Sequence, residues 1–228
     1  MSRVFDLEQT TIRALNQALH DLPETGNSET WQVLNPKGEH AIACGANADI
    51  NIEIQGHVGY YCAGMNQLAS IAVHGNVGTG VAENMMSGVV RVDGNASQSA
   101  GATAHGGLLV IKGDAAARCG ISLKGADIIV QGSVGHMTGF MAQKGNIVIC
   151  GDARHALGDS IYEANIYLRG NAADLGADCE EKAMEASDTE TLGNLLEQAQ
   201  INLPVGAFRH YGSARKLYHF DIKKAASY

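Results

Sequence analysis

Histidine and cysteine are the residue types in this chain that could bind a metal or take part in catalysis. Among the nine histidines, His136 and His155 stand at matching positions of successive copies of a repeat that is described below. In a stacked repeat they would lie about one strand spacing apart. A zinc site needs a third and fourth ligand, but the residues at the matching positions of the neighbouring copies are Ala117 and Asp174. We therefore predict a solvated or interfacial pair of histidines and no metal site.

The five cysteines are scattered along the chain without a Cys-x-x-Cys pair. An iron–sulfur or zinc site would need several of them to converge, and their odd number fits reduced thiols in a reducing compartment. We expect them to pack as small apolar side chains. These residues are Cys44, Cys62, Cys119, Cys150 and Cys179.

No catalytic motif is present in the sequence. It contains no Gly-x-Ser-x-Gly elbow, no phosphate-binding loop and no His-Glu-x-x-His helix. His74 alternates with core aliphatic residues, so it should point outward, and the acidic residues Glu53, Glu83, Asp93 and Asp114 fall at different positions of the repeat described below. We therefore predict neither a carboxylate pair nor any catalytic or cofactor-binding residue.

Charge and hydropathy exclude several classes of partner. The net charge of −8 and the isoelectric point near 5.5 argue against nucleic acid or an anionic membrane surface, which require a basic face. No apolar run approaches the ~18 residues of a membrane span. The amino-terminal segment carries Arg3, Asp6, Glu8 and Arg13 and lacks the apolar core of a signal peptide. We therefore expect a cytoplasmic protein.

The elements that must position these side chains are defined by a repeat in which glycine recurs at every nineteenth position. Large aliphatic residues stand two and four positions before each repeated glycine, which is the period of a strand that faces a core. A small apolar residue stands two positions after it, and further glycines recur about seven and twelve positions on. We predict an all-β, three-sided solenoid of seven coils with glycine at its corners. The repeated glycines are Gly56, Gly75, Gly94, Gly113, Gly132, Gly151 and Gly170.

Small polar residues directly follow most of these glycines and should form a ladder along one edge of the solenoid. The ends of the solenoid need caps, and helical patterns over residues 6–20 and 188–200 suit that task. The expected organisation is a capping segment at 1–49, the solenoid at 50–179, and a helix with a basic-aromatic tail at 180–228.

Two groups of residues are candidates for an interface. Tyr60, Tyr61, Met85 and Met86 are large residues near corners of the first two coils. Such residues are enriched at interfaces, although capping of the open first coil demands the same types. The tail mixes basic and aromatic residues that either fold back on the solenoid or reach a partner. Its candidate residues are Arg209, Tyr211, Arg215 and Tyr218.

Coils such as Val73-His74-Gly75-Asn76-Val77-Gly78 resemble the GXGXG domain that closes the large subunit of glutamate synthase and that also occurs in a subunit of formylmethanofuran dehydrogenase. That resemblance implies a single-stranded right-handed β-helix. The whole chain, including AGATAHGGLL at 100–109 and LGDSIYEA at 157–164, looks like the stand-alone GXGXG subunit of N-methylglutamate synthase.

The resemblance implies a scaffold without catalytic residues. In that family an amidotransferase-like subunit and a glutamate-synthase-like subunit, which carries FMN and an iron–sulfur cluster, form N-methylglutamate from glutamate and methylamine with release of ammonia. By analogy, this chain would hold those partners and line a passage for ammonia or methylamine. Two alternatives remain open: a scaffold for another amidotransferase, and a self-contained β-helix enzyme. The dispersed acidic residues and the position of the sole tryptophan, Trp31, before the coils count against the second.

Overall fold

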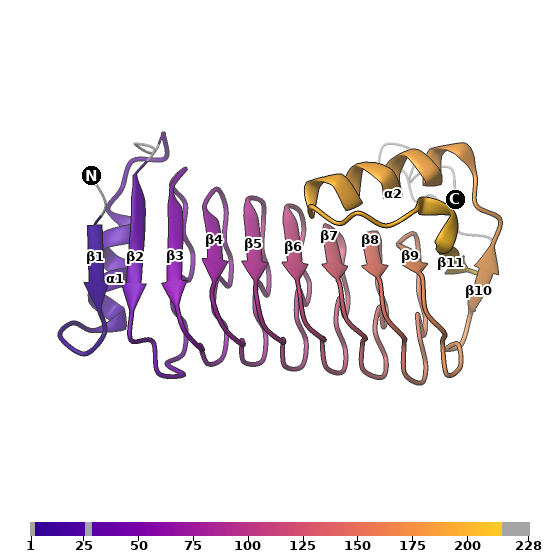
Figure 1. The fold of residues 1–228 in the computed structure, drawn as a ribbon, viewed down its shortest axis with the longest axis horizontal. Coiled ribbons are helices and arrows are strands. Elements are labelled where there is room, and N and C mark those ends of the chain that lie inside the picture. The colour runs from indigo at the N-terminus through magenta and orange to yellow at the C-terminus, as the bar shows by residue number, and fades with distance from the viewer. Residues whose placement is uncertain (1–2, 26–28, 216–228) are drawn as a thin grey trace, which may run out of the picture.

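The computed structural model describes residues 3–25 and 29–215, which form a long solenoid with its two ends far apart (Figure 1). Within these residues the strands make one 11-stranded sheet. The strands are β1 (Arg3–Asp6), β2 (Thr30–Leu34), β3 (Asn51–Gln55), β4 (Ser70–Val73), β5 (Val89–Val92), β6 (Leu108–Ile111), β7 (Lys124–Val130), β8 (Lys144–Ile149), β9 (Asn165–Leu168), β10 (Cys179–Lys182) and β11 (Arg209–Ser213). The helices are α1 (Ile12–His20), α2 (Ala186–Gln198) and the short 3₁₀-helix η1 (Val205–Ala207).

The predicted coils are confirmed by the pairing of β3 to β9. Consecutive strands run parallel, and the register joins matching positions of the repeat, as in Ile52 with Ile71 and Ile54 with Val73. The aliphatic residues at both inward positions are almost completely buried in one continuous core. A second row of single bridges, beginning with Val58 and Val77, marks the next side of each coil. The solenoid therefore forms because alternate residues of the strand in every coil point into one core.

The parallel sheet also extends upstream of the repeated glycines. Strand β2 pairs with β3 and joins Trp31 to Ile52 and Val33 to Ile54. The chain that follows β2 continues to bond to the next coil, with the Ala41 N–H donating to the Tyr60 carbonyl at 2.7 Å. The sequence repeat does not reveal this first turn, because Trp31 and Ile52 are further apart in the chain than Ile52 and its next partner, Ile71.

On the third side of each coil, every second residue has its backbone in the left-handed region. In one coil Gly80, Ala82 and Asn84 have φ values of 73°, 54° and 56°. The N–H groups of Gly80 and Asn84 donate to the following coil at 3.0 and 2.9 Å, and that of Ala82 donates to the preceding coil at 2.9 Å. Left-handed residues are usually single, but here three in each coil allow a compact curved side to keep its hydrogen bonds to both neighbours.

The repeated glycines are required by close stacking and, except at Gly56, not by positive φ. A Cβ placed on Gly113 would lie 2.7 Å from the carbonyl oxygen of Gly94 and 2.1 Å from Oδ1 of Asn95. Glycine is therefore needed at most of these corners because it keeps side-chain volume out of the neighbouring coil. The backbones approach each other through a Gly113 N–H bond of 3.0 Å to the Gly94 carbonyl, which leaves no room for a side chain.

The predicted polar ladder is present beside the glycines. Oδ1 of Asn76 accepts a 2.8 Å hydrogen bond from the Asn95 N–H, and Oδ1 of Asn95 accepts one of 2.8 Å from the Asp114 N–H. The pattern begins at His57 and continues to Asn171. Each side chain therefore satisfies a backbone donor of the next coil.

The two ends of the solenoid are closed in different ways. Helix α1 begins at its cap Thr11, whose hydroxyl accepts from the Ala14 N–H at 3.2 Å, and it buries Leu15 and Leu19 in the core of the first turn. The predicted N-terminal helix is confirmed over Ile12–His20, whereas Asp6, at the start of the predicted range, belongs to β1. At the other end, β11 pairs antiparallel with β9, and β10 pairs antiparallel with β11.

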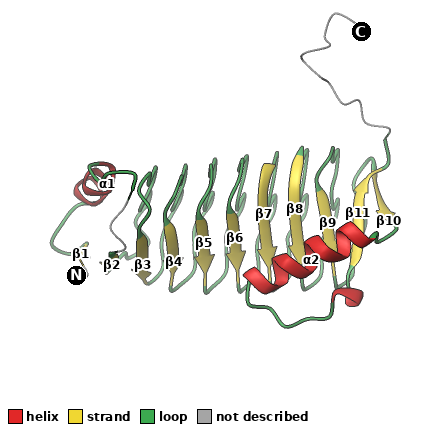
Figure 2. Ribbon diagram, turned by 90° about the horizontal axis from the view of Figure 1, so that it is seen from above, coloured by secondary structure: helices red, strands yellow, loops and turns green. Residues whose placement is uncertain are grey.

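Helix α2 is not the end cap that its position in the sequence suggests. It lies across the outer face of β7 to β9 (Figures 1 and 2). There Leu192, Leu195 and Leu196 form a second buried cluster with Ile129 and Val148. The prediction failed because the outward side chains of these coils are apolar and need a cover, whereas antiparallel strands close the end.

Candidate functional site

His74 lies in a row of alternating charge on the outer face of the sheet. Its Nδ1 atom is 2.7 Å from Oδ2 of Asp93, its Nε2 atom contacts Oε2 of Glu53, and Lys112 binds the other oxygen of Asp93 at 2.7 Å. The hydrogen bond to Glu53, and then that to Asp93, raises the pKa of His74. Lys112 and then His74 lower the pKa of Asp93. This arrangement favours an imidazolium held between two carboxylates.

The expected dispersal of the acidic residues is therefore wrong for Glu53 and Asp93. They occupy different positions of the repeat, but both positions face outward on coils adjacent to that of His74. Side chains on neighbouring strands reach each other diagonally as well as directly. His74 does point outward, as predicted, with a side chain that is 38% exposed.

His136 and His155 are both exposed at the surface. Nδ1 of His155 is 2.8 Å from Oδ2 of Asp174, the next residue of the same column. The pair is therefore part of the outer surface of the corner. Among the described residues, no group of three or more His, Cys, Asp or Glu side chains is arranged to hold a metal ion.

The five cysteines are unpaired thiols, and three of them are buried. Burial raises the pKa of Cys44 and Cys150 to about 11 and that of Cys119 to about 12. Thiols with such values are protonated near neutral pH and are poor nucleophiles. Their packing role agrees with the sequence-based interpretation.

A row of polar side chains crosses the last coils beneath the N-terminus of α2. Oδ1 of Asp127 accepts from Nδ2 of Asn146 at 2.7 Å, and Oδ1 of Asn146 accepts from Nδ2 of Asn165 at 3.2 Å. Nε2 of His210 lies 3.0 Å from Oδ1 of Asn165. Burial raises the pKa of Asp127. The row joins three coils to β11, which carries His210.

The row ends at Asp188 in the first turn of α2. Its Oδ2 atom accepts from the backbone N–H of Glu185 at 2.9 Å and lies 3.4 Å from Nδ1 of His210. Its Oδ1 atom accepts from the hydroxyl of Tyr167 at 3.0 Å. Asp188 therefore connects α2 to both β9 and β11, and this polar network has a structural role.

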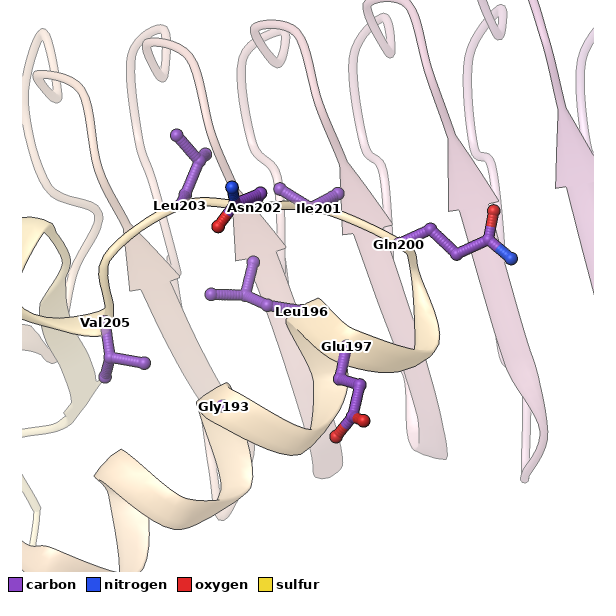
Figure 3. Close-up of a pocket in the computed structure, with 8 residues that line it drawn as sticks. All are labelled: Gly193, Leu196, Glu197, Gln200, Ile201, Asn202, Leu203 and Val205. Carbon is purple, nitrogen blue, oxygen red and sulfur yellow. The ribbon is translucent and has the colours of Figure 1, made fainter.

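A hollow of about 370 Å³ lies between the end of α2 and the segment that follows it (Figure 3). Leu196, Ile201, Leu203 and Val205 supply its apolar side chains, and the remaining lining residues are Gly193, Glu197, Gln200 and Asn202. Its only ionisable side chain is that of Glu197. The hollow is suited to an apolar side chain and lacks the paired acid and base groups of a hydrolytic site.

The four interface candidates of the first two coils differ in their exposure to solvent. Tyr60 is 59% exposed and stacks on His40 with ring centroids 4.4 Å apart, and Met86 is 50% exposed. Met85 is fully buried in the core, and Tyr61 is half-buried, with its hydroxyl 3.4 Å from Nδ2 of Asn84. Tyr60 and Met86 are thus the members that present a surface.

The second group lies at the opposite end of the solenoid. Arg209 donates to the carbonyl of Gly170 and lies 5.9 Å from the ring of Tyr211, which is buried in the core. Arg215 is exposed and pairs with Asp178. Tyr218 lies outside the described residues. Arg209 and Arg215 therefore lie at the far end of the solenoid, separate from Tyr60 and Met86.

Sequence reasoning missed two exposed apolar residues, Met65 and Leu68, on the same coil side as Met86. They are 46% and 42% exposed. No pattern marks Met65, because the left-handed position it occupies holds Asn84 and Thr103 in the next coils. The sequence does indicate the outer face that α2 covers. The residue three positions before the repeated glycine is Glu53 in the first coil but Val110 and Ile129 in later coils.

Comparison with known proteins identifies a relative of the same length. The chain is 52% identical over 226 residues to protein GlxC of Rhizobium meliloti (strain 1021), and the match covers 99% of each chain. No family model matches the sequence. Among the described residues no helix is long and apolar enough to cross a bilayer. With half of its residues identical along its whole length, the chain belongs to the GlxC family.

Proposed function

We propose that this chain is the non-catalytic scaffold subunit of a cytoplasmic complex similar to N-methylglutamate synthase, which forms N-methylglutamate and ammonia from glutamate and methylamine. The observation that carries the proposal is the full-length similarity to a GlxC protein, together with the resemblance of the coils to the GXGXG domain. The partners are an amidotransferase-like subunit and a glutamate-synthase-like subunit that carries FMN and an iron–sulfur cluster.

The form of the molecule supports a scaffold role. Stacked coils bond to each other through strands, bridges and side-chain ladders along their length, so the two ends are held at a fixed separation. Exposed residues capable of binding a partner lie near both ends, at Tyr60 and Met86 and at Arg209 and Arg215. Aromatic residues, methionine and arginine are enriched at protein interfaces.

The reactive side chains have structural partners. His74 is held between two carboxylates, and the buried thiols of Cys62 and Cys119 have pKa values raised by burial. These arrangements stabilise the solenoid and leave catalysis to the partner subunits.

The test is to tag this chain in its native host, isolate the material that accompanies it, and record its absorption spectrum. Two larger chains with the spectrum of a flavin and an iron–sulfur cluster support the proposal. Turnover with methylamine and with ammonia as amine donors then separates an N-methylglutamate synthase from a glutamate-synthase-like enzyme. A colourless single protein with hydrolase activity would contradict the scaffold role.

A further inference from the structure

The two edges of the 11-stranded sheet differ in how well they resist further pairing. The edge strand β10 carries Glu180, Glu181 and Lys182 in succession, and charged residues of this kind discourage the addition of another strand. The other edge strand, β1, carries an exposed valine, since Val4 is 53% exposed. Strand β1 is charged at its two ends, Arg3 and Asp6, but its exposed Val4 offers an incoming strand an apolar side chain, whereas three successive residues of β10 are charged.

The backbone of β1 also has hydrogen-bonding groups directed away from the sheet. The N–H of Leu7 donates to the Leu34 carbonyl of β2 at 3.0 Å. Because residues of a parallel strand alternate between their two neighbours, Arg3 and Phe5 also face β2, whereas Val4 and Asp6 face away. The Asp6 carbonyl accepts from the N–H groups of Gln9 and Thr10 at 2.9 Å. The N–H and C=O of Val4 therefore point outward from the edge.

A hollow of about 440 Å³ runs beside these groups. All four residues of β1 line it, and the turn after the strand closes it with Gln9 and Thr10. A trough along a whole edge strand, beside outward backbone groups, has the shape and the chemistry that an extended peptide requires.

We propose that β1 binds an extended segment of a partner subunit, which adds to the sheet as its next strand. This inference rests on the proposed scaffold function. The main chain of the segment bonds to Val4, and an apolar side chain of the segment packs on the Val4 side chain. A second copy of this chain is a poorer occupant, because two chains of net charge −8 repel each other.

Hydrogen exchange of the Val4 amide tests the proposal directly, in the isolated chain and in the purified complex. We expect fast exchange in the isolated chain and at least tenfold slower exchange in the complex, together with protection of one segment of a partner. Unchanged exchange in an intact complex would overturn the inference and leave the scaffold function standing. Absence of any complex would overturn both.

A pair of variants gives an independent readout. Val4→Pro removes the outward N–H but leaves the bonds to β2, and proline is tolerated on an edge strand in that position. Val4→Thr keeps the donor and the branched shape. We expect Val4→Pro to weaken binding of the partner at least tenfold and Val4→Thr less than threefold. Equal binding by both variants, or a dimer of the isolated chain that Val4→Pro dissociates, would contradict the proposal.

Discussion

The hydroxyl of Tyr167 donates a 3.0 Å hydrogen bond to Oδ1 of Asp188 and so joins β9 to the first turn of α2. The Tyr167 ring is fully buried and lies 5.1 Å from the ring of His210 on β11. Three segments that are distant in sequence meet at this contact. Asp188 therefore provides a polar anchor for the helix cover on the outer face.

Removal of that donor should loosen the cover. Tyr167→Phe leaves the ring in place but deprives Asp188 of a partner, so we expect the free energy of unfolding to fall by about 1–2 kcal/mol. Urea denaturation measures the change. The matched control is Tyr60→Phe at an exposed site, which should change stability by less than about 0.5 kcal/mol. Equal effects of the two substitutions would show that the hydroxyl of Tyr167 has no structural role.

The apolar side of α2 should account for most of its attachment. Leu192 is fully buried in the second cluster, and replacement of a buried leucine by alanine costs about 2–5 kcal/mol. We expect Leu192→Ala to increase hydrogen exchange throughout α2 while the strands β3 to β5 keep their protection. Uniform loss of protection along the chain would instead show that the cover and the solenoid unfold together.

A side chain at a stacked glycine should break the solenoid. The Cβ of Gly113→Ala would lie 2.7 Å from the Gly94 carbonyl oxygen, so two coils must separate and lose ladder hydrogen bonds. We expect a loss of more than about 3 kcal/mol and failure to assemble with partners, checked by thermal unfolding and co-purification. The control is Gly206→Ala, because nothing lies within 4 Å of the added Cβ. A stable, assembled Gly113→Ala protein would contradict the close-stacking explanation.

Gly193 should respond in the opposite direction. It lies inside α2, and the nearest atom to an added Cβ is Cγ2 of Val205 at 3.9 Å. Because alanine favours a helix over glycine by about 0.5–1 kcal/mol, Gly193→Ala should stabilise the protein by that amount in urea denaturation. A lower stability would mean that the hollow beside α2 does not accept the methyl group.

The charged row at His74 should make stability depend on pH. Its pKa is raised in the folded protein, so its stabilising effect is fully present below the ordinary value of 6.5 and is lost as the pH rises through the folded value. We expect His74→Gln to be less stable than the wild type at pH 5.5 and equally stable at pH 9. An equal deficit for His74→Gln at both pH values would exclude an ionic role.

The strand side of each coil was predictable from the sequence, whereas the left-handed side was predictable only at its glycines. The residues at the inward positions, such as Ile128 and Val130, are aliphatic in every coil because the core selects them. The left-handed positions accept Ser99, Arg118 and Met137 with φ values near 60°, because bonds to both neighbouring coils hold the backbone there. Side-chain type therefore gives no signal at those positions, whereas the glycines seven positions after the repeated ones, such as Gly101 and Gly120, do mark a left-handed residue.

The residue types of the candidate interface were predictable from the sequence, but the exposure of each side chain was not. Met85 and Met86 are adjacent in sequence, yet one is buried and the other is half exposed, because the corner turns between them. The repeat places Asp93 one coil after His74 at the same position, but the contact of His74 with Glu53 required knowledge of which outward positions are diagonal neighbours.

The ladder that joins Asn76, Asn95 and Asp114 has a consequence for how the length of this protein can change. Insertion or deletion of one residue within a coil would shift the glycine, the ladder and the inward side chains together, because all of them share the register of the repeat. Loss or gain of a whole coil preserves that register. The length of the solenoid can therefore change only in steps of about 4.8 Å, one for each coil. The distance between partners bound at its two ends would change by the same steps.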